Sequence, residues 1–512
     1  MPGLFDLGED VITGNLIPLL EPKDIQNLGQ TCRYARSIVN QGIVWREMYH
    51  KTFGKAPTPY SLTELKWPQL YKLRKDANLY TWGKFDGRLG LSRDAFPEGI
   101  MPGSVPWPVE LFHIPLADVT CGGLSFQVLT SDGDLYCTGS FHSAFRKGAP
   151  GPIERDSLRR MDDGAGSADH RLLRELPQAV IPHMRGPHRP GVMMMPDVKR
   201  ANEISATKKT AKKVDTKQGL LFQLLTEGTA KIIAVSSGRQ HVLALDNDGE
   251  VWTWDTDFLE DSVGVKLKFP GLRSGSIFSV SSPILKIRAG WNMSSVYALN
   301  LGIVVWMCRK KMSRSSQRSE GLEALYVVIP ETASTSDDDK VVDYVCLDNE
   351  LVYLKGSGKL FSIKVHRDAE SGETLLGRLL PLASKLKKVL SRTDKITRLS
   401  GSFRTLVAFT LEDHVIVLRQ ENGQEMEDAV PRIYEELQNV ECVSVAVGDW
   451  HYMALLKSGK VLTWGLNNGG CLGNGDLGVK RIDSPTEVKV EGKVLAIAAG
   501  GWQSGAIVAK EH

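Results

Sequence analysis

Histidine and cysteine side chains are the first candidates for acid–base, nucleophilic or metal chemistry in this chain, and their placement argues against all three. The seven cysteines lie far apart, and none forms the C-x-x-C pair of a zinc or redox centre. His241 and His451 occupy one position of a repeated pattern, where other copies carry Gln503, Arg404 or Ser125. A catalytic group is not expected to recur around a repeat, whereas a histidine that hydrogen-bonds neighbouring backbone is. We therefore predict a non-catalytic protein with no cofactor and no metal site.

The glycine-rich and acidic turns offer no ligand site either. Gly465–Gly475 has no strand-to-helix context and no lysine directly after it, so it lacks the features of a phosphate-binding loop. Asp132–Gly133 and Asp248–Gly249 each separate two short apolar runs, as hairpin turns do. We interpret all three as turns of the repeat.

A second set of residues suits binding rather than catalysis. Large aromatic side chains follow a recurring glycine in several copies of the pattern, and arginines stand beside some of them. Aromatic and arginine side chains are typical of interface hot spots. The predicted substrate-binding residues are Arg239, Trp291, Phe403, Arg404, Trp450 and Trp502. The sequence leaves two interpretations open: these side chains line one rim and dock a protein substrate, or they pack between adjacent repeat units.

The element that carries both sets is a unit of short strands, which is clearest at Val445–Gly473. Ser444–Val447, Tyr452–Leu456 and Val461–Trp464 are apolar runs separated by glycine-containing turns, which is typical of antiparallel strands. Ser484–Val490 is a candidate fourth strand. A small sheet of this kind cannot stand alone, so it needs neighbours of the same type.

Copies of the third strand recur roughly every fifty residues, apart from one doubled interval that holds an insertion. They are Leu79–Gly83, Leu135–Gly139, Val251–Asp255, Val304–Cys308, Leu360–Lys364, Val415–Arg419 and Val461–Gly465. Val494–Ala509 supplies two strands of a further unit, and Leu79–Leu91 begins with the third strand that it lacks. The sequence therefore predicts a mainly β protein. Residues 79–512 should form a closed seven-bladed β-propeller, preceded by a small all-α module.

These units resemble the regulator-of-chromosome-condensation repeat. The Gly238–Trp254 unit fits the pattern, and the best copy matches it at Gly448, His451, Ala454, Leu455, Gly459, Val461, Trp464, Gly465, Asn467, Gly470, Leu472 and Gly473. Some propellers of this family are guanine-nucleotide exchange factors for small GTPases. The resemblance therefore implies nucleotide exchange as one alternative function.

Residues 1–53 differ in kind from the rest of the chain. Apolar residues within Leu7–Leu20, Ile25–Val39 and Val44–Phe53 lie at helical spacings, and Asp24 is a candidate N-cap for the second helix. About fifty residues of short helices cannot bury all of these side chains among themselves. Some are therefore expected to cover a partner.

The helical module resembles the F-box. The family pattern is matched at Leu7–Gly8, Leu19–Leu20, Glu21–Ile25, Thr31–Arg33 and Trp45, with Gly8 in place of the family's proline. The resemblance implies binding to a Skp-family adaptor and through it to a cullin. The implied contact residues are Leu7, Leu16, Leu19, Leu20, Ile25 and Trp45. A helical cap on the propeller is the alternative.

Two connecting segments complete the domain plan. Residues 54–78 are expected to form a linker, in which Lys55–Tyr60 is a stiff proline-containing spacer and Ser61–Glu64 is a capping box for a docking helix ending near Leu73. Residues 141–228 are expected to form a flexible insertion in the second unit. Its basic segment at residues 199–213 is either a bipartite nuclear localisation signal or a solvated loop.

The charge and the apolar pattern of the sequence limit the functions that it can have. The formal net charge of +3 gives no support to nucleic-acid binding, and no apolar run approaches the roughly 18 residues of a membrane helix. The amino terminus has no signal-peptide pattern, so a cytoplasmic or nuclear location is expected. We predict the substrate-recognition subunit of an SCF ubiquitin ligase, which binds a protein substrate for ubiquitination and proteasomal degradation. A GTPase exchange factor and a chromatin scaffold are the alternatives.

Overall fold

The structure is a computed structural model that divides into two compact units, Met1–Pro150 with Lys213–His512, and Gly151–Lys212. It describes residues 7–20, 22–53, 66–109, 115–139, 213–215, 220–226, 230–255, 263–269, 284–299, 301–307, 322–382, 386, 389–391, 393–421 and 424–510. All of them belong to the first unit. Most of the insertion expected at 141–228 lies outside the described residues, including its basic segment apart from Lys213.

Seven antiparallel sheets, each built on a four-stranded meander, make up most of the described chain. Blade 1 is β3 (Leu116–Cys121), β4 (Phe126–Thr130), β5 (Leu135–Cys137) and β7 (Leu220–Leu224), with β6 (Lys213–Asp215) at its edge. Blade 2 is β8 (Ile232–Ser237), β9 (His241–Asp246), β10 (Val251–Asp255) and β11 (Val265–Lys268), with β15 (Leu322–Glu323) paired in parallel. Blade 3 is β12 (Ile284–Ala289), β13 (Met293–Ala298), β14 (Gly302–Met307) and β16 (Tyr326–Val328).

The remaining four blades follow the same order. Blade 4 is β17 (Val341–Cys346), β18 (Glu350–Lys355), β19 (Leu360–Arg367) and β20 (Thr374–Pro381). Blade 5 is β21 (Ile396–Ser402), β22 (Thr405–Thr410), β23 (Val415–Arg419) and β24 (Val430–Ile433). Blade 6 is β25 (Cys442–Val447), β26 (His451–Leu456), β27 (Val461–Leu466) and β28 (Arg481–Val488). Blade 7 is β29 (Lys493–Gly500), β30 (Gln503–Ala509), β1 (Ala77–Gly83) and β2 (Trp107–Val109).

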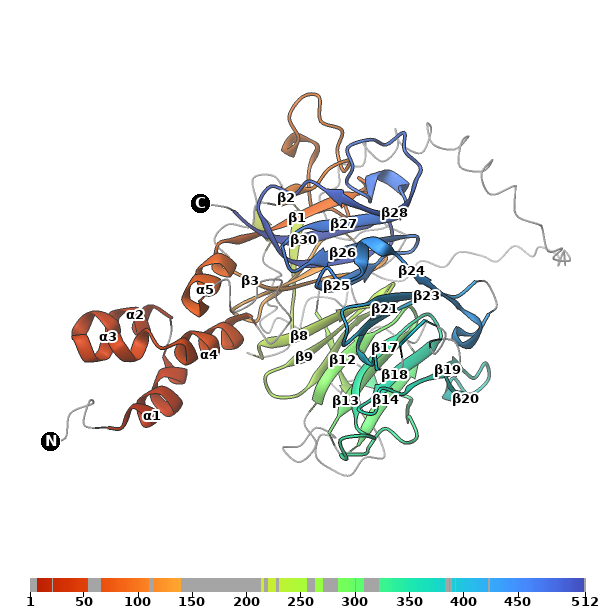
Figure 1. The fold of residues 1–512 in the computed structure, drawn as a ribbon, viewed down its shortest axis with the longest axis horizontal. Coiled ribbons are helices and arrows are strands. Elements are labelled where there is room, and N and C mark those ends of the chain that lie inside the picture. Colours follow the sequence, from red (N-terminus) through yellow and green to blue (C-terminus); the bar gives the residue numbers. More distant parts are fainter. Residues whose placement is uncertain are drawn as a thin grey trace, which may run out of the picture. The chain divides into compact units, whose positions relative to one another are not determined.

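The blades close into a ring. Their first strands lie next to one another in the cyclic order β3, β8, β12, β17, β21, β25, β29 and back to β3. β1 pairs with β30 over its whole length, with Leu79 opposite Ile507, and Figure 1 shows the orange β1 beside the blue β30. The predictions of a seven-bladed propeller, of its seven third strands and of a blade shared by both ends are confirmed.

A β-bulge recurs near the start of every first strand, at its second residue or, in β29, its third, and sequence reasoning did not foresee it. The extra residues are Ala117, Ile233, Leu285, Val342, Thr397, Val443 and Leu495. A bulge increases the local twist of a strand. Every blade keeps this feature, including blades 3 to 5, where most of the glycines of the repeat pattern are missing.

The two repeat histidines join neighbouring blades. Nε2 of His241 lies 2.9 Å from the Ser294 hydroxyl, and Nε2 of His451 lies 2.9 Å from the Ser504 hydroxyl. Each serine stands on the second strand of the next blade, so the contact crosses between blades rather than staying in the local backbone. Burial lowers the pKa of both histidines to about 4, which keeps the rings neutral near pH 7. Position 448, three residues before His451, has to be glycine because a Cβ there would lie 2.2 Å from the imidazole ring of His451.

The amino-terminal module consists of short helices. They are α1 (Glu9–Val11), a π-helical turn (Ile12–Leu16), a 3-10 turn (Ile17–Leu19), α2 (Pro22–Thr31), α3 (Arg33–Val39), α4 (Gly42–Phe53) and α5 (Trp67–Lys75). The longest described helix, α4, has 12 residues, whereas a transmembrane helix needs about twenty. Within the described ranges no helix can therefore cross a membrane.

Two helix predictions were wrong in detail. The helix expected over Ile25–Val39 is broken at Cys32, whose backbone is extended and whose Sγ accepts a hydrogen bond from the Ala35 amide at 3.3 Å. A residue with that backbone caps a new helix instead of continuing the old one. Asp24 lies in the first turn of α2, because the helix already begins at Pro22, a residue favoured at that position.

Helix α5 joins the module to the propeller. Its start differs from the prediction, since it begins at Trp67, and the expected capping box at Ser61–Glu64 lies outside the described residues. The buried Arg74 donates from Nη2 to the carbonyl of Ala117 at 2.8 Å and from Nε to that of Leu116 at 3.4 Å. These carbonyls stand at the start of β3. The helices are thereby tied to the end of the ring at which the first strands begin.

The ring closure gives a direct prediction. Deleting Val494–His512 removes nearly all of β29 and β30 and leaves β1 with an unpaired edge. We expect loss of a single cooperative unfolding transition and aggregation at micromolar concentration, measured by calorimetry and light scattering. The control deletes only Lys510–His512, which follow β30, and should unfold like the full chain. A long truncation that unfolds as sharply and at the same temperature would contradict this role for β30.

Candidate protein-docking rim

The loops between the first and second strands of the blades meet at one end of the ring. Backbone hydrogen bonds join neighbouring loops there, and we call this set of bonded loops the collar. The bonds run from Gly123 N to Arg239 O (3.0 Å), Arg239 N to Trp291 O (3.4 Å), Trp291 N to Leu347 O (2.9 Å), Asp348 N to Phe403 O (2.6 Å) and Asp449 N to Gly501 O (3.1 Å). The collar fixes where each loop side chain emerges.

At the collar position, blades 1 and 7 carry a glycine because the backbones come too close there for a side chain. Gly501 has a φ of 43°, and a Cβ there would lie 1.9 Å from the Gly123 carbonyl oxygen. A Cβ at Gly123 would lie 2.7 Å from the Arg239 carbonyl oxygen. The side chains at this level of the collar therefore come from the other five blades.

Three of the predicted substrate-binding aromatics form one arc along the collar. The ring centroids of Trp291 and Phe403 lie 4.3 Å apart, and those of Phe403 and Trp450 lie 6.4 Å apart. Trp450 is 44% exposed, whereas Trp464 on the third strand of the same blade is 1% exposed. The arc is thus partly open to solvent, and other tryptophans fill the space between blades.

A positively charged side chain lies over the ring of each of these aromatic residues and of Trp502. Arg239 stacks over Trp291 at 4.5 Å, Arg404 over Phe403 at 4.9 Å and Arg419 over Trp450 at 4.6 Å. Trp502, from the blade 7 loop, carries Lys84 at 4.4 Å and has Arg88 at 5.9 Å. Such contacts are favourable by about 0.5–1 kcal/mol when exposed and hold flexible cations in place. The structure therefore groups five of the six predicted rim residues around the arc, with Trp502 on a separate cationic pair.

Two carboxylates also stand on the collar. Burial raises the pKa of Asp348, although Arg404 opposes the shift, and Asn292 donates to its Oδ1 at 2.8 Å. Burial raises the pKa of Asp449 to about 6, even with Arg239, Arg88 and Arg419 nearby. Among the described residues, Oδ1 of Asp449 has no hydrogen-bond partner. Asp449 is therefore a largely buried carboxyl group that lies near three arginines, and one of its oxygens accepts no hydrogen bond from the described residues.

The backbone of Phe403 is strained. Its φ is 51°, in the left-handed region that bulky side chains rarely adopt. Such a conformation costs of the order of 1–3 kcal/mol and persists only where surrounding contacts enforce it. The short bond from the Asp348 amide to the Phe403 carbonyl is one of those contacts.

The strand register corrects one sequence alignment. Strand β21 continues to Ser402, which pairs with Thr405, whereas the corresponding pair in blade 6 is Gly448 and His451. Ser402, and not Gly401, is therefore the residue of blade 5 that corresponds to Gly448 of blade 6. Arg404 is therefore the equivalent of Trp450, and Thr405, not Arg404, occupies the histidine position. Phe403 corresponds instead to Asp449.

Several rim residues were missed from the sequence. They are Lys84, Arg88, Asp348, Arg419 and Asp449. Asp449 carried a usable signal, because it directly follows the repeat glycine and precedes Trp450. Lys84 and Arg419 follow or end third strands, so only the folded ring brings them to the loops between first and second strands.

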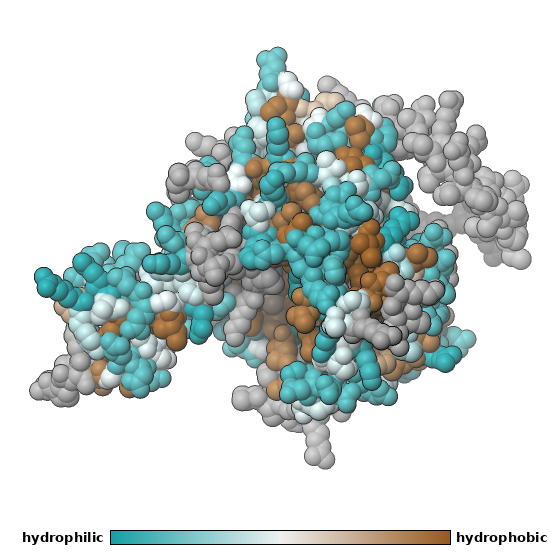
Figure 2. Space-filling view, in the orientation of Figure 1, coloured by the Kyte–Doolittle hydropathy of each residue, from teal (hydrophilic) through white to brown (hydrophobic). Residues whose placement is uncertain are grey.

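The six predicted adaptor-contact residues fall into three groups. Leu7 and Leu19 are exposed, Leu16 and Leu20 are half-buried against the core of the module, and Ile25 and Trp45 are buried inside it. Further exposed apolar side chains, which sequence reasoning missed, are Val11, Tyr34 and Ile43. Figure 2 shows brown, apolar side chains on the surface of these helices. Ile43 carried a signal, because it lies off the buried stripe of α4.

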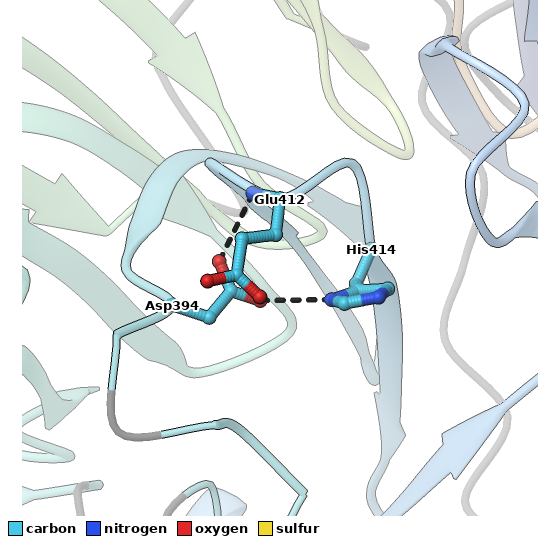
Figure 3. A group of neighbouring side chains, drawn as sticks. All are labelled: Asp394, Glu412 and His414. Carbon is cyan, nitrogen blue, oxygen red and sulfur yellow. Dashed lines mark hydrogen bonds and ion pairs between the residues drawn. The ribbon is translucent and has the colours of Figure 1, made fainter.

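A cluster of Asp394, Glu412 and His414 has ligand-type atoms within 4.8 Å of one another (Figure 3). Oδ1 of Asp394 accepts from the amides of Lys395 at 2.9 Å and Glu412 at 3.1 Å, and its Oδ2 lies 2.9 Å from His414 Nδ1. These bonds hold the turn between β22 and β23 against the residues before β21. We assign the cluster to that structural task.

Comparison with known proteins places these features in context. The family described as "Regulator of chromosome condensation (RCC1) repeat" matches residues 458–507, and a second description of this repeat matches 232–254 and 442–471. The chain is similar to SCF-associated factor 1 of Saccharomyces cerevisiae, with 27% identity over 99% of this chain and 98% of that protein. It also resembles F-box protein pof9 of Schizosaccharomyces pombe, with 24% identity over 55% of this chain and 58% of that protein.

A solved structure agrees with the fold. Yeast RCC1 (Prp20), crystallised with Kap60, matches with a TM-score of 0.52 over 85% of this chain and 90% of that chain. Because the sequence identity is only 13%, this match supports the fold and no statement about function. The expected resemblance to an F-box protein with regulator-of-chromosome-condensation repeats is confirmed by these matches, since the two relatives described above are named as an SCF-associated factor and an F-box protein.

The contrast between two tryptophans gives a prediction. Trp464→Ala should lower the free energy of unfolding by about 3–5 kcal/mol, because a buried aromatic is lost. Trp450→Ala should lower it by less than about 1 kcal/mol, because its ring is half exposed. Urea unfolding of both variants measures the difference. Equal destabilisation would assign Trp450 to the packing between blades.

Asp449 gives a second prediction. Its pKa is about 6 in the folded chain and near its ordinary value when unfolded, so the folded state takes up a proton as the pH falls through 6. The ionised side chain therefore disfavours folding at pH 7.5, and this penalty fades toward pH 4.5. Asp449→Asn should be more stable than the wild type by about 1–3 kcal/mol at pH 7.5 and by much less at pH 4.5. Urea unfolding at both pH values tests this, and a less stable variant at pH 7.5 would show that the carboxylate is needed by its arginines.

Proposed function

We propose that this chain is the substrate-recognition subunit of an SCF ubiquitin ligase. Its helical module binds a Skp-family adaptor and through it a cullin, and its rim binds the protein that is ubiquitinated and then degraded by the proteasome. The chain itself contributes binding surfaces rather than catalytic groups. The observation that carries the proposal is the exposed apolar surface of the helical module, which the module cannot bury by itself.

The module separates framework residues from contact residues. Ile25 and Trp45 are buried and hold the helices together, with Trp45 packing edge-on to Tyr71 at 5.4 Å. Leu19 is 77% exposed, and Leu7 and Ile43 are also exposed. Exposed apolar side chains that gather on a small module are a sign of an interaction site. In this proposal Leu7, Leu19 and Ile43 contact the adaptor, while Ile25 and Trp45 support them from inside.

The two binding surfaces lie at opposite ends of the first strands. Arg74 holds α5 to the beginning of β3, and the rim loop Gly122–Ser125 follows the end of β3. A strand of six residues spans roughly 20 Å. An adaptor on the helices therefore leaves the rim accessible, as a substrate receptor requires. The name of SCF-associated factor 1, which aligns over nearly its whole length, supports the same assignment.

Nucleotide exchange on a small GTPase remains an alternative outcome rather than a second proposal. The likeness to Prp20 carries the fold alone at 13% identity. Release of labelled GDP from a panel of small GTPases, with and without the full chain, distinguishes exchange from substrate recognition. Accelerated release without binding to a Skp-family adaptor would replace the proposed function.

The adaptor surface is tested by one leucine and a matched control. Leu19→Asp should weaken binding of a purified Skp-family adaptor at least about ten-fold, because burial of a leucine contributes about 1.5–3 kcal/mol. Leu411→Asp, at a leucine that is 70% exposed on the propeller turn between β22 and β23, should leave the affinity unchanged. Calorimetric titration gives the affinities, and thermal unfolding checks that both variants fold. Full adaptor affinity in a folded Leu19→Asp variant would contradict the proposal.

A further inference from the structure

The rim carries more positive than negative charge. Its cations are Lys84, Arg88, Arg239, Arg404 and Arg419, and its carboxylates are Asp86, Asp348 and Asp449. Arg88 is paired with Asp86 through two bonds of 2.6 Å. Arg404 approaches Asp348 at 4.0 Å. Among these described residues, five cations therefore lie beside three carboxylates.

The excess charge is held in a fixed place. Arg239 lies over the ring of Trp291, with Cζ 4.5 Å from the centroid. A guanidinium has five N–H donors, so one held in this way still has donors for a further partner. Lys84 is held over Trp502 in the same manner. Arg419 differs, since it donates to the Tyr452 hydroxyl at 2.8 Å and to the Asp449 carbonyl at 3.1 Å. Arg239 and Lys84 are therefore the cations best placed to receive a partner's acidic groups, with Arg404 beside them in its 4.0 Å contact with Asp348.

The aromatic arc, over whose rings Arg239, Arg404 and Arg419 lie, is of peptide dimensions. Its two centroid separations, 4.3 and 6.4 Å, together equal the length of about three residues of extended chain. The arc is partly exposed at Trp450. At its middle, Phe403 is held in a left-handed backbone conformation, and strain of this kind is concentrated at binding sites.

We propose that the rim recognises an acidic segment of its protein partner. An apolar side chain of that segment packs on the arc of Trp291, Phe403 and Trp450, and carboxylates on either side of it pair with Arg239, Arg404 and Lys84. Arginine clusters are a recurrent means of recognising acidic motifs, because the guanidinium fork matches a carboxylate. The inference rests on the proposed function in one respect, namely that the partner is the ligase substrate.

The test selects binders from a phage library of random twelve-residue peptides on the immobilised full chain. Peptides enriched by the wild type should contain Asp and Glu at least about three-fold above the library, next to a large apolar residue. A synthetic copy of the best peptide, and a copy with Gln and Asn replacing Glu and Asp, are then measured by fluorescence anisotropy. The acidic peptide should bind at least about ten-fold more tightly, and higher salt should weaken it.

Two variants separate binding from folding. Phe403→Gly removes the ring and relieves the left-handed strain, so it should unfold at or above the wild-type temperature and bind the peptide at least about ten-fold more weakly. Arg239→Glu should weaken binding by a similar factor. Its control, Arg432→Glu, makes the same charge change on the exposed outer strand β24 and should leave binding within about two-fold.

The outcomes are distinct. Enrichment of basic or uncharged peptides, no enrichment at all, or unchanged affinity in both rim variants would overturn the acidic-segment proposal. Adaptor affinity is measured on the same proteins. Loss of peptide binding with adaptor affinity retained supports the rim assignment, whereas acidic-peptide binding without any adaptor binding would leave the rim proposal standing and overturn the proposed ligase role.

Discussion

The pairing of β1 with β30 is the constraint on which the rest of the structure depends. It joins a strand from near the start of the propeller to the last strand of the chain, so that blade 7 is complete only when both are present. A closed ring leaves no first or last blade with an uncovered sheet face. Closure also brings Gly501 of blade 7 against Asp449 of blade 6 and Gly123 of blade 1, at the level of the collar.

Holding the ring together and presenting a surface are assigned to different residues of the same unit. Trp82, Trp254 and Trp464 on third strands are fully buried, and the histidine–serine bonds join blades 2 and 3 and blades 6 and 7. Because these contacts hold the blades, the loops between first and second strands are free to differ. Blade 3 places a tryptophan there, blade 4 an aspartate, blade 5 a phenylalanine and an arginine, and blade 6 an aspartate and a tryptophan. A repeated scaffold with unlike loops is well suited to recognising one partner.

In the helical module, too, some residues hold the helices together and others form the exposed surface. Its short helices bury Ile25, Ile38 and Trp45 among themselves and pack on α5, which is anchored by Arg74. The buried residues specify how the helices cross, and the leucines left outside provide the surface. The role proposed above needs such a fixed connection, because the distance between the two proposed binding surfaces governs which lysines of a bound protein can be reached.

The sequence by itself determined the strands, their period, the number of blades and the sharing of blade 7, because alternation of apolar residues and glycine-containing turns are local properties. It also identified the rim aromatics as a set. Only the tertiary structure decided their arrangement, since Trp291 and Phe403 stack across from blades 3 and 5 with blade 4 between them. The same holds for the shifted register at Ser402, the bulge in every first strand and the helix break at Cys32. Each of these depends on contacts or backbone angles that no short stretch of sequence specifies, and the burial of a side chain is settled by what the rest of the ring places beside it.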